Sequence, residues 1–191
     1  AGMYAVFHGP DGLKEIAKKI HSNACILEEN LNLLGFKTPN KSFFDTILVK
    51  CDSKLIRGKA LDKEVNFHYP NDSSVSISIN ETTTTNDIYE IISIFAESKN
   101  TKLENFSNFE SLNRIPKEYS RTTSFLTDEV FSKYKSETSL MRYIKFLEKK
   151  DLALNTSMIS LGSCTMKLNA AAEMLPLLSL IHISEPTRQE A

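Results

Sequence analysis

Residues 160–167 form the densest group of chemically capable side chains in the sequence. They read Ser-Leu-Gly-Ser-Cys-Thr-Met-Lys and precede an Ala-rich stretch that begins at Asn169. Exposed backbone N–H groups at the start of a helix suit a phosphate or a carboxylate. Cys164 could act as a nucleophile, and Lys167 could form a Schiff base. A purely structural interpretation stays open, in which Ser163 or Thr165 caps the helix and Cys164 packs as a small apolar residue.

The other polar candidates have structural explanations. His8 precedes Gly9-Pro10 in an expected turn, His21 lies beside the polar face of an expected helix, and His68 alternates within a strand. No pair of histidines has metal-ligand spacing together with a carboxylate, so the sequence predicts no metal site. The hydroxyls of residues 82–85 are explained by a cap between a strand and a helix.

Composition excludes several classes of protein. The 191 residues include 23 Lys and Arg against 24 Asp and Glu, giving a formal charge of −1. No basic field attracts nucleic acid, and no apolar run approaches the ~20 residues of a membrane span. The three Cys form no CxxC pair, so we expect neither a disulfide scaffold nor a thiolate zinc site. A reducing compartment is the default expectation.

Apolar periodicity predicts an α+β unit over residues 1–98. Residues 11–34 carry apolar side chains at steps of three and four, which is typical of an amphipathic helix. Residues 45–51 have the β-branched density of a buried strand, and 65–69 and 75–79 alternate as a hairpin around a Pro-Asn-Asp-Ser turn. A second helix begins at Thr84 or Thr85, with an inward stripe of Ile88, Ile91, Ile92 and Phe95.

The second part of the chain has a different character. Residues 99–135 lack a sustained period up to about Thr127, and we interpret them as a linker lying over a surface. Its expected aromatic anchors are Phe106, Phe109 and Phe125. Helical periodicity resumes at Ser136, and Leu140, Tyr143, Ile144 and Leu147 share one face.

Both ends of the sequence look non-native. The beginning has no initiating Met and no signal peptide, which suggests that the chain starts within a longer protein. Residues 178–188 resemble the translation of a sequencing-library adapter, and we expect the whole of 178–191 to be a non-native tail. The alternative is a short apolar strand ending at Glu185-Pro186. A non-native tail removes His182 from the candidate residues.

Two blocks of sequence resemble the glycine cleavage system P-protein family, the glycine decarboxylases. The stronger block is Tyr134–Leu177, with a distinctive core at 161–176 that reads LGSCTMKLNAAAEMLP. The other is YAVFHGPDGL at 4–13, followed in order by Phe-Asp-Thr at 44–46 and Glu-Thr-Thr-Thr at 81–84. One departure is Ser160, where the family usually has Pro.

The resemblance implies a fold class and a chemistry. It implies an α/β architecture, the type I fold of pyridoxal-phosphate (PLP) transferases, arranged as two tandem halves. Residues 1–98 would be the C-terminal small α+β domain of the first half, 99–135 the linker between halves, and 136–177 the beginning of the second half. Such enzymes decarboxylate glycine and pass the aminomethyl group to the lipoyl arm of H-protein.

Site residues follow from the resemblance only in part. The family's Schiff-base lysine lies in a His-Lys-Thr motif that does not occur in this sequence. That role is therefore not assigned to Lys167, no catalytic residue is expected in this chain, and the chain alone is expected to be inactive. The loop Ser163, Cys164 and Thr165 is expected to line the cofactor pocket.

The remaining expectations concern partners, location and an alternative. The resemblance implies glycine and lipoylated H-protein as partners and a homodimer of the complete enzyme, without nucleic acid or membrane. The compartment would be the cytoplasm of a bacterium or the mitochondrial matrix of a eukaryote. The alternative is a stand-alone, non-catalytic α+β regulatory or interaction module, which requires a native start and stop.

Overall fold

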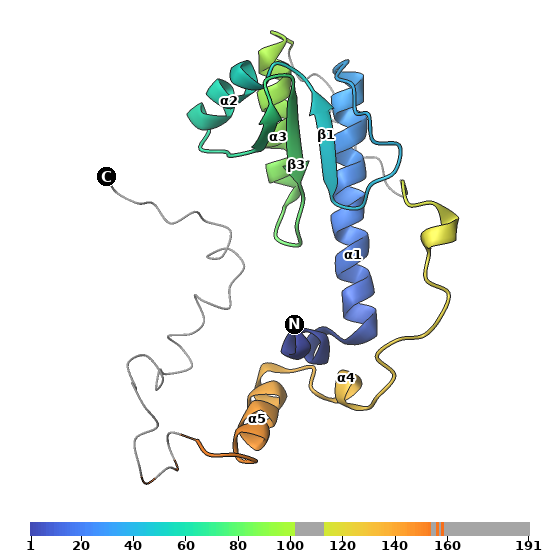
Figure 1. Ribbon diagram of the computed structural model, residues 1–191, viewed down its shortest axis with the longest axis vertical. Helices are drawn as coiled ribbons and strands as arrows, with labels where there is room; N and C mark the ends of the chain where they lie inside the picture. Colours follow the sequence, from blue (N-terminus) through green and yellow to red (C-terminus); the bar gives the residue numbers. More distant parts are fainter. Residues whose placement is uncertain (102–112, 154–155, 157, 159–191) are drawn as a thin grey trace. The chain divides into compact units, whose positions relative to one another are not determined.

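The computed structural model describes residues 1–101, 113–153, 156 and 158 (Figure 1). The chain divides into two units, each considered by itself. One unit is Asp11–Ser124, and the other combines Ala1–Pro10 with the part of the chain from Phe125 onward. The predicted loop 160–167, the Ala-rich stretch, the tail 178–191 and the aromatic anchors Phe106 and Phe109 lie outside the described residues.

Helix α1 (Gly2–Leu33) consists of two helical parts separated at Gly9. Gly9 has φ 62° and ψ −174°, and Pro10 after it has no N–H to donate, so the regular hydrogen bonding is interrupted there. The predicted turn at residues 8–10 corresponds to this break, and the predicted helix from Asp11 is confirmed. The helical conformation before the break was not predicted.

The end of α1 follows from its sequence. Gly35 adopts φ 77°, a left-handed conformation that costs glycine little. Its N–H donates to the carbonyl of Asn32 at 2.8 Å, and the N–H of Phe36 donates to the carbonyl of Leu31 at 3.0 Å. These two bonds form a Schellman motif, which satisfies carbonyls that the last helical turn leaves without partners.

A three-stranded antiparallel sheet in the order β1-β3-β2 forms the centre of the Asp11–Ser124 unit. Strand β1 (Thr46–Lys50) confirms the prediction for 45–51. Strands β2 (His68–Asn71) and β3 (Ser74–Ser78) form the predicted hairpin. The first hairpin strand was predicted too early, because Pro70 and Asn71 continue the strand and only residues 72 and 73 turn.

Helix α2 (Ser53–Asp62) is absent from the sequence prediction. Its buried residues, Ser53, Ile56 and Ala60, are mostly small, and Gly58 lowers its helix propensity, so the apolar period is weak. The available signal was Asp52, whose carboxylate accepts hydrogen bonds from the N–H groups of Lys54 and Leu55 at the helix start.

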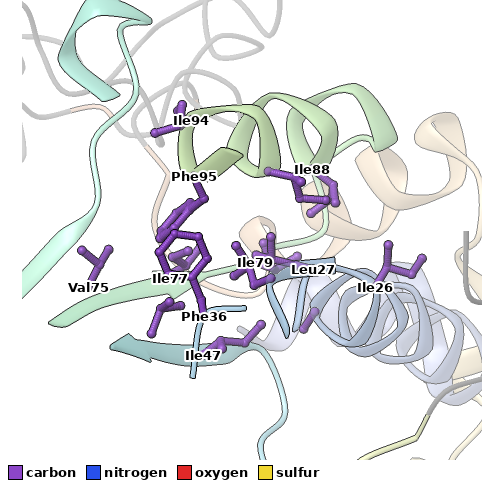
Figure 2. Packing of buried hydrophobic residues seen from close by; sticks show 14 of the residues in the cluster. Ile26, Leu27, Phe36, Ile47, Val75, Ile77, Ile79, Ile88, Ile94 and Phe95 are labelled. Atoms are coloured by element: carbon purple, nitrogen blue, oxygen red, sulfur yellow. The ribbon is translucent and has the colours of Figure 1, made fainter. Parts of the chain in front are cut away.

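Helix α3 (Thr85–Ser98) contributes to the same hydrophobic core as the sheet. Thr84 is its N-cap, as predicted, and three of the four predicted stripe residues are buried; Ile91 is half-buried. Figure 2 shows Phe95 of α3 beside Phe36, and their rings meet edge to face at 5.1 Å between centroids. The core joins α1, α3 and one face of the sheet through Leu27, Ile47, Val75, Ile77, Ile79 and Ile88.

The described part of the other unit contains helices α4 (Val130–Lys133) and α5 (Glu137–Glu148). Ser136 caps α5, and the N–H of Ser139 donates to its hydroxyl at 3.3 Å, which confirms the predicted helix start. None of the α5 residues is buried. Near the end of the Asp11–Ser124 unit, a 3₁₀ turn, η1 (Lys117–Tyr119), follows Pro116.

The observed fold class is therefore a mixture of helices and a small antiparallel sheet. Within the described ranges, neither a parallel strand pair nor a helix long and apolar enough to cross a membrane is present.

Candidate functional site

His21 of α1 is buried, with 6% of its surface exposed. The prediction that it lies beside the polar face of the helix is wrong. Its ring lies parallel to that of Phe44, with 6.0 Å between the ring centroids, and tilted against that of Phe43 at 5.9 Å. A buried polar ring needs hydrogen-bond partners, because leaving them unmade costs free energy.

Two backbone contacts give each nitrogen of the His21 ring a defined role. Nδ1 lies 2.8 Å from the carbonyl oxygen of Phe44, and a carbonyl can only accept, so Nδ1 carries the hydrogen. The backbone N–H of Arg114 donates to Nε2 at 3.0 Å, so Nε2 is the acceptor. These two backbone contacts fit a neutral imidazole with its hydrogen on Nδ1. Oδ1 of Asn113, 3.1 Å from Nε2, is an acceptor and fits a hydrogen on Nε2 instead.

An ion pair lies on α1 beside this histidine. Arg114 donates through Nε and Nη2 to Oε2 of Glu28, at 3.2 and 3.0 Å, and also through Nη2 to Glu29. Oε1 of Glu28 accepts from Asn32 at 2.9 Å and from Thr38 at 3.0 Å. Both carboxylate oxygens of the buried Glu28 are thus satisfied, as a buried charge requires.

The charges and burial change the titration of neighbouring groups. The hydrogen bond to Glu28 raises the pKa of Arg114, and the nearby charges of Glu28 and Glu29 act in the same direction against the effect of desolvation. Burial raises the pKa of the Cys25 thiol, whose Sγ lies 3.5 Å from Nε2 of His21. Cys25 is therefore protonated at neutral pH and is not an activated nucleophile.

A second candidate is a hollow of about 280 Å³ beside the start of α2. Its lining includes Cys51, Asp52 and Lys99. Asp52 already caps α2, and Lys99 donates to the carbonyl of Leu34 at 2.8 Å while its Nζ lies 4.2 Å from the Phe36 ring centroid. Burial raises the pKa of Cys51 to about 11. These groups have structural roles, and the hollow offers no reactive nucleophile at neutral pH.

The other predicted site residues have different outcomes. The loop Ser163, Cys164 and Thr165 and the neighbouring Lys167 fall in the part of the chain that the structure does not describe. His8 contacts the rings of Tyr4 and Phe7. In the described ranges no group of three or more His, Cys, Asp and Glu side chains could hold a metal ion.

The capping interpretation of residues 82–85 is confirmed by two sets of hydrogen bonds. Oδ1 of Asn80 accepts hydrogen bonds from Thr82 and Thr83. Thr84 forms a capping box with Asp87. These hydroxyls serve the turn and the start of α3.

Sequence reasoning missed the cluster around His21. Glu28, Glu29, Asn113 and Arg114 were not considered, although a helical signal was available. Positions 21, 25 and 28 follow one another at steps of four and three, so they share a face of α1 next to the apolar stripe. The contribution of Arg114 comes from 86 positions further along the chain, which no local pattern reveals.

Comparisons with known proteins come from a family model and from curated relatives. The family model described as Glycine cleavage system P-protein matches residues 1–95. A protein of Flavobacterium johnsoniae named glycine dehydrogenase (decarboxylating) is 57% identical over 177 residues, or 93% of this chain. Proteins of the same name from Christiangramia forsetii and Bacteroides fragilis are 55% and 49% identical, again over 93% of the chain. The chain spans about a fifth of these relatives, 19% of each.

Proposed function

Because this chain belongs to the glycine cleavage system P-protein family, we propose that it is a segment of a glycine dehydrogenase (decarboxylating). The observation that carries the proposal is the 57% identity to the Flavobacterium johnsoniae protein over 93% of the chain. Identity at this level across both described units favours a common parent rather than a shared small module.

The complete enzyme would decarboxylate glycine and transfer the aminomethyl group to lipoylated H-protein. PLP would supply the electron sink for that chemistry when bound. The protein would orient glycine and the cofactor and would present the product to the lipoyl arm. These activities belong to the proposed parent protein, of which this chain spans about a fifth.

The described residues do not fit a PLP site by themselves. A lysine that attaches the cofactor needs a desolvated setting to lower its pKa, and none of the described lysines is buried. Lys99, beside the hollow near α2, is committed to the Leu34 carbonyl and the Phe36 ring. No chemical step is therefore assigned to a described residue, and cofactor attachment is proposed to lie elsewhere in the parent protein.

The finer fold and domain assignment is also a proposal. Residues 1–98 would form the small α+β domain of the first half of a type I PLP fold, 99–135 the linker, and 136–177 the beginning of the second half. The loop at Ser163, Cys164 and Thr165 would line the cofactor pocket. Residues 178–191 would be a non-native tail.

Partners and location follow from the same proposal. Glycine and lipoylated H-protein would be the substrates, and the complete enzyme would be a homodimer that binds neither nucleic acid nor membrane. The relatives named above are bacterial, which favours the cytoplasm over the mitochondrial matrix.

The test is to recover the complete reading frame around this segment and to express its product with PLP. Release of labelled CO₂ from carboxyl-labelled glycine should depend on both PLP and lipoylated H-protein. The 191-residue chain, tested in parallel, should release no CO₂, and borohydride should trap no PLP adduct by intact mass. A complete product without glycine-dependent release would refute the proposed activity, and an adduct on Lys167 would refute the assignment of cofactor attachment elsewhere.

A further inference from the structure

The hydrogen bonds of His21 connect two distant parts of the Asp11–Ser124 unit through one titratable ring. Phe44 on one side and Arg114 on the other both bond to it through the backbone. We propose that His21 is a pH-sensitive latch for the backbone of Arg114: the neutral ring on α1 accepts the Arg114 N–H, and protonation of the ring releases this N–H while Nε2 turns to Asn113 Oδ1.

The neutral ring fits the observed backbone contacts in one tautomer only. Nδ1 must donate to the Phe44 carbonyl, which leaves Nε2 as the acceptor for the N–H of Arg114. Protonation places a hydrogen on Nε2, which then faces the hydrogen of Arg114 N–H. The acceptor is lost, and two donors are left pointing at each other.

Asn113 provides an acceptor for the protonated ring. Its Oδ1 lies 3.1 Å from Nε2 of His21 and also accepts from the N–H of Ile115 at 2.8 Å. The contact with Ile115 settles the orientation of the amide, because an N–H cannot donate to the NH₂ group. The two states of His21 thus select different partners: Arg114 N–H when neutral, and Asn113 Oδ1 when charged.

The surrounding charges oppose one another. Glu28 and Glu29 on α1 favour an imidazolium at position 21, whereas the Arg114 guanidinium that pairs with them opposes it. The Cys25 thiol is protonated and lies 3.5 Å from Nε2. The rings of Phe43 and Phe44 lie beside His21 and carry no charge. The carboxylate of the next residue, Asp45, accepts a hydrogen bond from the hydroxyl of Thr46.

The consequence is that the backbone hydrogen bond of Arg114 depends on pH, whereas the packing of the core does not. The core of the unit rests on residues such as Leu27, Ile92 and Phe95, which have no titratable side chains. Residues 113–115 contact α1 through polar groups. Loss of the bond to His21 therefore frees the backbone N–H of Arg114, while Asn113 and the ion pair of Arg114 with Glu28 keep the segment on α1.

Nuclear magnetic resonance on the ¹⁵N-labelled 191-residue chain tests the latch. The ring nitrogens of His21 should report hydrogen on Nδ1 at high pH. On acidification, the hydrogen-exchange protection of the Arg114 amide should fall by about tenfold in step with the ring's titration, as expected for one lost hydrogen bond. The Ile92 amide in α3 serves as the reference for global unfolding and should keep its protection.

Variants make the test specific. His21→Gln carries no titrating ring, so the protection of Arg114 should not depend on pH over the same range, whereas His68→Gln, an exposed histidine of β2, should behave like the parent. Asn113→Asp places a carboxylate next to Nε2 and should move the midpoint of release upward by about one pH unit.

Three results would overturn the proposal. They are a hydrogen on Nε2 in the neutral ring, unchanged protection of the Arg114 amide across the His21 titration, and an unchanged midpoint in Asn113→Asp. The first two are measured on the parent chain, so they remain decisive where a variant folds poorly.

Discussion

The guanidinium of Arg114 lies 3.0 Å from a carboxylate oxygen of Glu28, a residue 86 positions earlier in the chain. Glu28 is buried, with 8% of its side chain exposed, whereas Arg114 keeps a third of its side chain in solvent. The pair is therefore asymmetric. Removing the arginine leaves a buried carboxylate with one oxygen lacking its partner, whereas removing the carboxylate leaves an arginine that water can reach.

This asymmetry predicts the effect of Arg114→Ala. The variant should lower the free energy of unfolding by about 1–3 kcal/mol, the range for a buried polar group left without its partner. Urea denaturation followed by circular dichroism measures the change. Lys117→Ala is the matched control, because it removes the same charge from the exposed turn η1 and should change stability by less than about 0.5 kcal/mol. Equal effects of the two variants would show that the ion pair with Glu28 does not stabilise the unit.

A substitution at Gly58 in α2 should stabilise the unit. A Cβ at this position meets no atom within 4 Å, and Gly58 lies inside the helix. Gly58→Ala should raise the free energy of unfolding by about 0.5–1 kcal/mol, because alanine loses less backbone entropy in a helix.

The matched variant for Gly58→Ala is Gly35→Ala in the same unit. Gly35 has φ 77°, and a Cβ there would lie 3.1 Å from Nζ of Lys99. This variant should be destabilising by about 1 kcal/mol, because alanine is strained in the left-handed region. Thermal unfolding of both variants should give melting temperatures on opposite sides of the parent. Melting temperatures on the same side would contradict the helix assignment or the conformation at Gly35.

Thr84 gives a prediction about a helix start. Its hydroxyl accepts from the N–H of Asp87 at 3.2 Å, and the Asp87 carboxylate accepts from the N–H of Thr84 at 2.6 Å. Thr84→Ala should lower the free energy of unfolding by about 1 kcal/mol, as is typical for loss of an N-cap. Thr85→Ala changes a neighbouring exposed hydroxyl and should be nearly neutral. A larger effect at Thr85 than at Thr84 would place the helix start one residue later.

Local patterns in the sequence were sufficient for much of the fold. The apolar steps of α1 and α3, the β-branched run of β1 and the cap at Thr84 are local signals, and the structure contains each of them. Helix α2 was missed because Ser53, Ile56 and Ala60 form a weak apolar stripe, while the cap at Asp52 was its available signal.

The site around His21 could not be predicted from local patterns in the sequence. Its partners Phe44 and Arg114 are 23 and 93 positions away, so only the tertiary fold brings them to the ring. His21 was predicted to lie beside the polar face of the helix, whereas it is buried, because its ring nitrogens find hydrogen-bond partners in the tertiary fold. Conversely, the loop at Ser163, Cys164 and Thr165 rests on sequence resemblance alone, since it lies outside the described residues.

Cys51 connects stability to pH. Burial raises the pKa of its thiol from 9.0 to about 11, and the charge of Asp52 adds to the effect. Between these two pH values the unfolded chain loses the thiol proton while the folded chain keeps it, so the folded state binds more protons. The stabilising contribution is therefore complete below pH 9 and decreases as the pH rises toward 11. Cys25, whose pKa is also raised by burial, acts in the same direction.

Urea unfolding of the parent chain and of Cys51→Ser at pH 8, 9.5 and 11 measures this contribution. Below pH 9 the difference in unfolding free energy between the two proteins should be constant. As the pH rises above 9, the parent should lose stability relative to Cys51→Ser, because serine does not titrate there. Iodoacetamide gives an independent readout. At pH 8 the folded chain should be alkylated at Cys51 on the order of 100-fold more slowly than the urea-unfolded chain, since only the thiolate reacts. Equal alkylation rates in the two states, or a difference between parent and variant that does not change with pH, would show that the partial burial of Cys51 does not raise the pKa of its thiol.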